Sequence, residues 1–240
     1  MKSLREFTSA RVDLGRTGHS LPTCELLDFQ LAHARARDAV HLPLDVHSML
    51  LELKQKNIPC VALASEANDR FTYLHRPDLG RRLNSESRER LAPLKSDYDA
   101  VFVIADGLSA LAVHRHAVPL LELVHSKLDW NIAPVTIVGL GRVAIGDEIG
   151  ELLGAKLAVV LIGERPGLSS PDSLGTYLTW QPRPGRTDAE RNCISNIRTE
   201  GLSYELAAHK LLFLMNESRR LKLSGVHLKE GAPQLPDSGV

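Results

Sequence analysis

The sequence predicts an α/β protein with a Rossmann-like, mostly parallel sheet and flanking helices, preceded by a small all-helical N-terminal domain. From residue 57 onward, short apolar and β-branched runs alternate with segments of helical periodicity, which is typical of βαβ units. Residues 1–56 instead combine strong helix formers with one apolar stripe. We therefore expect a helical domain at 1–56, a Rossmann-like domain at 57–230, and a disordered tail rich in Gly, Pro and Ser at 231–240.

The expected elements can be placed by periodicity and by their boundary residues. Buried strands are expected at Val61–Ala64, Val101–Ala105, Val135–Val138, Leu157–Ile162 and Thr176–Trp180. Besides the crossover helix that ends at Gly154, helices are expected at 26–40, Val46–Lys56, Leu108–Leu128, 188–198 and Tyr204–Leu221. Asn57 and Pro59 end the second of these helices, and Asp188 is the expected N-cap of the fourth.

Residues 134–168 form a complete unit of strand, glycine turn, helix and strand. Gly139 and Gly141 allow the backbone to turn tightly, and Gly154 ends the helix that follows. The second strand is a continuous apolar run, as expected when both faces of a sheet are covered, and it leads into the residues Gly163–Pro166. Ligands of open parallel sheets bind outside the carboxyl ends of the strands, so we expect a ligand there.

The glycine turn also fits the dinucleotide fingerprint. The segment Gly139–Ala144 reads GLGRVA, and Glu164 lies close to the offset of about 20 residues at which an acidic residue binds a ribose hydroxyl. An NAD-dependent oxidoreductase is therefore one hypothesis. Against it, the unit lies in the second half of the chain, and the loop GERPGLSSPDSLG has no evident role in a dehydrogenase.

Composition excludes several classes of function. The 29 basic and 29 acidic residues balance, which gives no electrostatic case for binding nucleic acid or an anionic membrane. The longest apolar runs are far shorter than the ~20 residues that span a bilayer, and the first residues lack the features of a secretory signal. The three cysteines have no CxxC spacing, so we expect no disulfide framework, no zinc site and a cytoplasmic location.

Several segments resemble the small (light) subunit of ethanolamine ammonia-lyase, in the order of that family. They cover the chain from Leu4 to about Lys229. The segments are LREFTSARVDLGRTGHSLPTCELLDFQLAHARARDAVH, RPDLGRRL, VIADGLSA, RVAIGDEIGE, GERPGLSSPDSLG, DAERNCISNIR and GLSYELAAHKL.

The resemblance implies a function, a cofactor and a partner. These enzymes use adenosylcobalamin to convert ethanolamine to acetaldehyde and ammonia. In the family the small subunit covers the corrin, the large TIM-barrel subunit carries the substrate site, and equal numbers of both form a hetero-oligomer. The family's cofactor-binding positions match Val143 in the RV motif, Glu164 in GERPG and Cys193 in DAERNCISNIR.

Taken alone, these three residues have simpler interpretations. Val143 would be a core valine and Cys193 a buried, inert thiol. Glu164 would form an ion pair with Arg165 or Arg142. A non-catalytic scaffold subunit, which keeps the subunit contacts and binds no cofactor, is therefore a further hypothesis.

The chain lacks the DxHxxG motif by which some proteins replace the benzimidazole of cobalamin with a histidine. Its nearest approximation, Asp45–Leu50, has no glycine, so we expect His47 to be a surface or capping residue and the cofactor to bind base-on. His114 and His116 are two residues apart on a predicted helix and should point to different faces. Ser109 lacks a GxSxG context and should lie near a helix N-terminus.

These patterns identify no catalytic residue and no metal ligand in this chain, because no carboxylate pair or histidine cluster is sufficient for deamination. The resemblance starts at Leu4, which leaves little room for the N-terminal extension that some members use to enter a bacterial microcompartment. Encapsulation in such a compartment is therefore an open question at this point.

Overall fold

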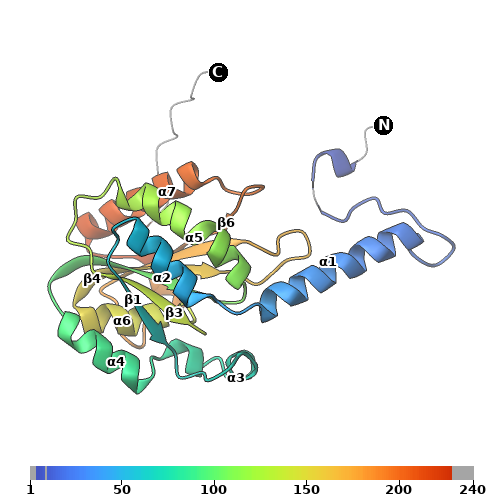
Figure 1. Cartoon of the computed structure of the whole chain (residues 1–240). Coiled ribbons are helices and arrows are strands. Elements are labelled where there is room, and N and C mark those ends of the chain that lie inside the picture. Colours follow the sequence, from blue (N-terminus) through green and yellow to red (C-terminus); the bar gives the residue numbers. More distant parts are fainter. Residues whose placement is uncertain (1–3, 9, 229–240) are drawn as a thin grey trace.

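The computed structural model describes residues 4–8 and 10–228, which form an α/β fold in layers (Figure 1). The helices are α1 (Thr23–His41), α2 (Val46–Gln55), α3 (Arg70–His75), α4 (Ser85–Leu91), α5 (Ala110–His125), α6 (Ile145–Leu153) and α7 (Tyr204–Leu221). The strands are β1 (Cys60–Ala64), β2 (Tyr98–Ala105), β3 (Val135–Gly139), β4 (Ala155–Gly163), β5 (Leu174–Trp180) and β6 (Arg191–Ile197). The strands expected from the sequence are all present.

The sheet is mixed, which corrects the prediction of a mostly parallel one. Its order is β1-β3-β2-β4-β5-β6. Strands β1, β3, β2 and β4 pair in parallel, whereas β5 pairs antiparallel to both β4 and β6. The reason is the connection from β4 to β5, which is a loop without a crossover helix, so the chain reverses direction when it returns to the sheet.

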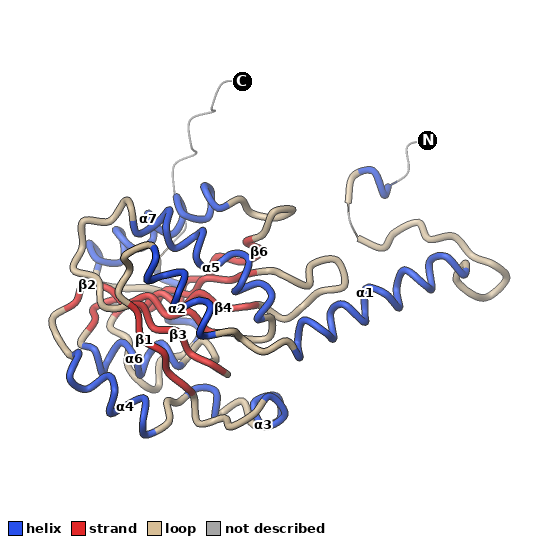
Figure 2. The backbone as a smooth tube through the Cα atoms, in the orientation of Figure 1, coloured by secondary structure: helices blue, strands red, loops and turns tan. Residues whose placement is uncertain are grey.

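Helices cover both faces of the sheet (Figure 2). On one face, β-strand side chains such as Phe102 and Ile137 pack with α2, α5 and α7. On the other face, residues such as Val103 and Val160 pack with α4 and α6. Neighbouring residues of one strand thus enter opposite cores, which explains why these strands are continuous apolar runs.

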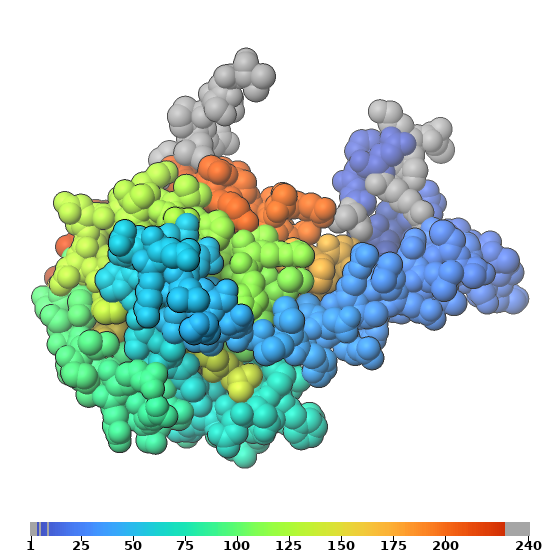
Figure 3. All heavy atoms as spheres, in the orientation of Figure 1, coloured from blue at the N-terminus to red at the C-terminus, as the bar shows by residue number. Residues whose placement is uncertain are grey.

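A separate all-helical N-terminal domain is not confirmed. Met49 and Leu53 of α2 belong to the core of the sheet. Helix α1 instead extends away from the main body, as Figures 1 and 3 show. No helix among the described residues is long and apolar enough to cross a membrane. The predicted disordered tail, 231–240, lies outside the described residues.

The helix predicted at 188–198 is wrong, because this segment is a short 3-10 turn (Asp188–Glu190) followed by β6. The N-cap of the turn is Thr187 and not Asp188. The pairing of β6 with β5 contains a register shift, and Asn196 has a φ of 61°. This irregularity lets Ile194 and Ile197 both face the core although they are three residues apart, a spacing that imitates a helix.

Helices α3 and α4 were not predicted. They have 6 and 7 residues and are too short for a clear periodicity. Their N-caps could have indicated them, since Asp69 accepts from Thr72 N and Asn84 from Ser87 N, both at 2.8 to 2.9 Å.

A buried ion pair joins the ends of the parallel strands. Asp106, directly after β2, is 2% exposed and accepts from the backbone N of Gly141 at 3.0 Å. Arg70 of α3 lies 3.2 Å from the same carboxylate and also donates to the backbone oxygens of Gly107 and Val40. This one arginine therefore connects α3, the end of α1 and the turn after β2.

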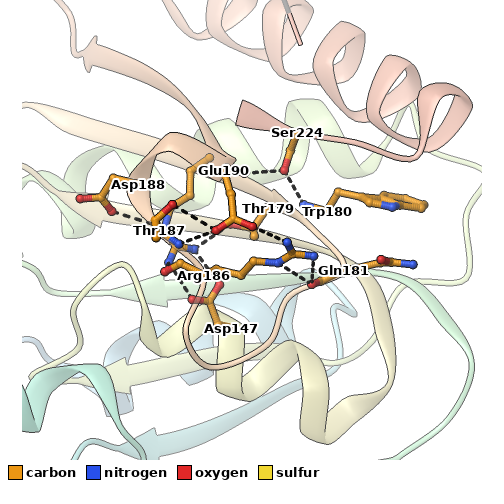
Figure 4. A network of polar contacts seen from close by, with 10 residues as sticks. Asp147, Thr179, Trp180, Gln181, Arg186, Thr187, Asp188, Glu190 and Ser224 are labelled. Carbon is orange, nitrogen blue, oxygen red and sulfur yellow. Dashed lines mark hydrogen bonds and ion pairs between the residues drawn. The ribbon is translucent and has the colours of Figure 1, made fainter. Parts of the chain in front are cut away.

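A second buried pair fixes α6 against the antiparallel strands. Arg191 of β6 donates to both carboxylate oxygens of Asp147 at 2.6 and 2.7 Å, and it also donates to Thr179 and to the backbone oxygen of Arg186. Figure 4 shows Asp147 pointing from α6 toward the loop that carries Arg186 and Thr187. The pair holds this loop over the start of α6.

Asp147→Ala is expected to destabilise the fold by about 3 to 5 kcal/mol, because it leaves the buried Arg191 charge without its partner. Urea unfolding measures the loss. Glu217→Ala is the control, since Glu217 forms an exposed pair with Arg220 and its removal should change little. A double replacement, Asp147→Leu with Arg191→Met, should recover most of the loss. A small effect of Asp147→Ala alone would contradict the role assigned to the pair.

Asp106 should make stability depend on pH. Burial raises its pKa from 3.8 to about 6, against the lowering effects of Arg70 and the backbone amides. The folded state therefore binds more protons than the unfolded state between these values, so this group's contribution falls as pH rises from 3.8 to about 6. In Asp106→Asn this group's contribution to the pH dependence of the free energy of unfolding should disappear. Urea unfolding between pH 3.8 and about 6 should therefore show that the stability of the variant rises relative to that of the wild type as pH rises. A difference in stability between variant and wild type that does not change with pH would mean that the effect of Arg70 on the pKa of Asp106 cancels the effect of burial.

Candidate functional site

The carboxyl ends of β2, β3 and β4 surround a cavity of about 270 Å³. It lies where the glycine turn after β3 faces the loop after β4. The lining residues are Tyr73, Gly107, Leu108, Arg142, Val143, Ile162, Gly163, Glu164, Arg165 and Tyr177. The position agrees with the expectation that a ligand binds outside the carboxyl ends of the strands. We call it the strand-end cavity.

Two glycines allow the backbones around this cavity to meet. Gly107 has a φ of 56°, and a Cβ there would lie 2.2 Å from the backbone oxygen of Gly163. A Cβ on Gly163 would lie 2.0 Å from the backbone oxygen of Ser109. The backbone N of Leu108 donates to the Gly163 oxygen at 2.9 Å. Only glycine fits at both places, so the floor of the cavity is rigid backbone.

Val143 is half-buried between the glycine turn and α6. It packs against the core beneath α6 and also lines the strand-end cavity. This side chain therefore contributes to the core and also faces the cavity.

Among the described residues, Glu164 forms no ion pair with Arg165 or Arg142, which contradicts the interpretation from the sequence alone. Its carboxylate accepts from the hydroxyls of Ser173 and Ser195, each at 2.5 Å, and from the backbone N of Asn196 at 3.3 Å. These contacts join the end of β4 to β6. A carboxylate has about four acceptor positions, so the geometry leaves capacity for one more donor.

Cys193 is exposed and lies on strand β6. The sequence alone had suggested a buried thiol in a helix, and that interpretation is wrong. It lies directly opposite Tyr177 of β5, and side chains at such positions share one face of the sheet. Tyr177 itself lines the strand-end cavity. Burial, followed by the neighbouring Cys193, raises the pKa of Tyr177, so the phenol stays protonated. The structure thus brings Val143 and Glu164 into one cavity and places Cys193 beside its wall.

Tyr73 and Arg142 also line this cavity, and sequence reasoning had not selected them as site residues. Tyr73 is completely buried and donates from its hydroxyl to the backbone oxygen of Gly141 at 3.1 Å. The Arg142 guanidinium lies 4.2 Å from the centre of the Tyr73 ring, close enough for a cation–π interaction. Arg142 is the first residue of the motif RVAIGDEIGE. Its charge directly after the glycine turn could have indicated it as a site residue.

A second pocket, of about 450 Å³, adjoins the strand-end cavity and shares Arg142 and Val143 with it. We call it the arginine pocket. Its lining residues are Pro77, Arg81, Arg142, Val143, Ala144, Arg186, Thr187, Asp188 and Arg191.

The other polar residues considered from the sequence have structural roles. Ser109 is the N-cap of α5 and donates to the backbone oxygen of Pro171, which confirms its expected place near a helix N-terminus. His114 accepts from the backbone N of Asp45, whereas the buried His116 contacts the Tyr204 hydroxyl, so the two do point to different sides. His47 is an exposed residue in the first turn of α2.

The Asp106 carboxylate already accepts from the amide of Gly141 in the glycine turn. A dinucleotide pyrophosphate would need such amides, and a carboxylate in the same place would repel it. Among the residues lining the strand-end cavity, Glu164 is the carboxylate and no histidine is present. The cavity therefore offers one carboxylate to a ligand.

Comparison with known proteins identifies the family of this chain. The family model for the ethanolamine ammonia-lyase light chain matches residues 1–229. The ethanolamine ammonia-lyase small subunit of Pseudomonas syringae pv. tomato is 57% identical over 236 residues, which is 95% of this chain and 82% of the relative. The small subunit of Azotobacter vinelandii is 57% identical over 238 residues, 96% of this chain and 88% of the relative. The chain therefore belongs to the ethanolamine ammonia-lyase light-chain family.

Proposed function

We propose that this chain is the small subunit of an adenosylcobalamin-dependent ethanolamine ammonia-lyase and binds the cofactor at its interface with the large subunit. The observation that carries the proposal is the strand-end cavity of a light-chain family member, where Val143 and Glu164 lie together and Cys193 lies beside the wall. The assembled enzyme deaminates ethanolamine to acetaldehyde and ammonia.

The residues present fit a corrinoid. The corrin is broad, flat and fringed with amide side chains, and a cavity of about 270 Å³ could accept only part of it. Val143 and Tyr177 offer apolar surface, while Glu164 offers an acceptor for an amide N–H. Arg142 Nε is buried without a hydrogen bond to any described residue. This donor at the edge of the strand-end cavity could therefore bind an acceptor of the ligand.

The role of this chain is binding and positioning. When bound, adenosylcobalamin supplies radical chemistry through homolysis of its cobalt–carbon bond. Ser173 and Ser195 orient the Glu164 carboxylate, so that it meets a donor without losing side-chain entropy. The backbone contact between Gly107 and Gly163 keeps the floor of the cavity rigid beneath the ligand. We assign no catalytic residue and no metal ligand to this chain.

We further propose that the cofactor binds base-on. Neither the strand-end cavity nor the arginine pocket is lined by a histidine among the described residues. His47, the residue of the nearest sequence approximation to DxHxxG, is exposed on α2 and belongs to the helix layer on the sheet. This arrangement supports the cofactor's own benzimidazole as the axial ligand.

The large subunit is the proposed partner, in a hetero-oligomer. Helix α1 stands clear of the main body in Figure 3 and exposes large apolar side chains. Leu27 and Leu31 are 58% and 51% exposed, and Leu26 and Phe29 lie on the same helix at 43% and 40%. Several large apolar side chains exposed on one helix typically mark a protein–protein contact. We propose no nucleic-acid or membrane partner.

We place the enzyme in the cytoplasm, because its three cysteines form no disulfide. Residence inside a bacterial microcompartment stays a hypothesis. The two other hypotheses differ in their ligands, since an NAD-dependent oxidoreductase would bind NAD without a second chain and a scaffold subunit would bind no corrinoid.

The isolated chain should show no lyase activity, and activity should appear when it is co-expressed with the large subunit. The reason is that the strand-end cavity has no acid–base pair. The lyase activity is measured as the adenosylcobalamin-dependent release of acetaldehyde from ethanolamine. Turnover by the rigorously purified chain with cofactor would contradict the proposal, and NAD reduction by the chain alone would favour the oxidoreductase.

Glu164→Ala in the assembled enzyme should weaken adenosylcobalamin binding by about one to two orders of magnitude, as expected for losing one charge-assisted hydrogen bond. Equilibrium dialysis measures the dissociation constant. Because Glu164 also joins β4 to β6, Glu164→Gln serves as a second variant that retains the size of the side chain.

Glu151→Ala is the matched control for these variants, since Glu151 is exposed near the C-terminus of α6, away from the strand-end cavity. Its affinity should equal that of the wild type. Unchanged cobalamin affinity in both Glu164 variants would contradict the assigned role.

A further inference from the structure

The arginine pocket carries an excess of positive charge. Four of its lining residues are arginines, Arg81, Arg142, Arg186 and Arg191, against the single carboxylate of Asp188. Two of these arginines are neutralised by residues outside the lining. Arg191 pairs with Asp147, and Arg186 pairs with Glu190. The remaining two, Arg81 and Arg142, decide what the pocket can bind.

Arg81 and Arg142 form no ion pair with any carboxylate among residues 4–8 and 10–228. By contrast, Arg76 and Arg88 in the same region pair with Asp78, Glu66 and Glu148. Two unpaired guanidinium groups on one pocket create a local positive potential that favours an anion.

Arg142 is held in place before any ligand arrives. Its backbone N donates to the Gly80 oxygen at 2.7 Å, and its NH2 group donates to the backbone oxygen of Tyr73 at 3.2 Å. A Cβ on Gly80 would lie 2.9 Å from the Arg142 Cγ, so the glycine gives the side chain room to lie over the Tyr73 ring. A guanidinium fixed in this way loses little entropy when it binds an anion.

The arginine pocket adjoins the strand-end cavity, because Arg142 and Val143 line both. An anion in the pocket would therefore belong to the same ligand as the group that contacts Val143 and Glu164, or to a separate ion beside it. A planar guanidinium matches the paired oxygens of a phosphate ester better than a point charge does.

We propose that the arginine pocket is a phosphate-ester subsite in which Arg81 and Arg142 bind the phosphodiester of the cobalamin nucleotide tail. The inference rests on the proposed function, since it assigns one part of the cofactor to one part of the site. Base-on binding keeps the tail folded against the corrin, so its phosphodiester stays within reach of a pocket that adjoins the strand-end cavity.

The test compares two corrinoids in the complex with the large subunit. Adenosylcobalamin carries the phosphodiester, whereas adenosylcobinamide lacks the whole nucleotide tail. Arg81→Gln should weaken binding of adenosylcobalamin roughly tenfold, the effect of losing one charge-assisted contact at a partly hydrated site, and leave the affinity for adenosylcobinamide unchanged. Arg142→Gln should weaken the binding of adenosylcobalamin more than that of adenosylcobinamide, and some loss is expected for both because Arg142 also lines the strand-end cavity. Equilibrium dialysis measures both constants, and a thermal melt verifies folding.

Arg82→Gln is the matched control. Arg82 is the exposed neighbour of Arg81 in the same segment but does not line the arginine pocket. Removing it changes the net charge equally, so its affinity for both corrinoids should equal that of the wild type. An equal loss for both corrinoids in Arg81→Gln, or no loss for either, would overturn the proposal.

Inorganic phosphate separates the two sources of the anion. If the pocket holds the phosphodiester, orthophosphate should compete with adenosylcobalamin and not with adenosylcobinamide. If orthophosphate binds together with adenosylcobalamin and Arg81→Gln removes only the orthophosphate, the pocket is a site for free phosphate and the proposal is wrong. A wild-type complex that binds neither corrinoid would instead refute the proposed function itself.

Discussion

The contact between Asp106 and the Gly141 amide is the constraint on which the binding edge depends. It joins the ends of β2 and β3 where the helices that follow these strands, α5 and α6, lie on opposite faces of the sheet. In an open sheet, a crevice forms at the carboxyl ends of two neighbouring strands whose following helices lie on opposite faces. Arg70 neutralises the carboxylate and also holds the end of α1 through the Val40 oxygen, so a buried charge positions the elements around the cavity.

The antiparallel part of the sheet extends the wall of this crevice. Because β4 returns through a loop as β5, Tyr177 pairs with Val160 of β4 on one side and with Cys193 of β6 on the other. A further crossover helix would have placed a parallel strand there, with its own loop over the same edge. Glu164 then links this extension to β4 through two serine hydroxyls, so the edge of the site is a single rigid unit.

The arginines of this chain serve two purposes, which their partners distinguish. Those with carboxylate partners, such as Arg70 and Arg191, hold buried elements together. Arg142 is instead supported by an aromatic ring and backbone oxygens, which orient the guanidinium without neutralising it. A charge that is oriented and not neutralised is available to a ligand. This difference separates Arg142 from the structural arginines, of which Arg191 also lines the arginine pocket.

The sequence by itself determined the buried strands and the glycine turn, because side chains that enter a core on both faces must be apolar, and it determined the family through its motifs. It could not determine β6, since the irregular pairing at Asn196 gives Ile194 and Ile197 a helical spacing. It also missed the serine partners of Glu164 and the stacking of Arg142 on Tyr73. Those contacts join residues 9 to 69 positions apart, and only the folded chain brings them together.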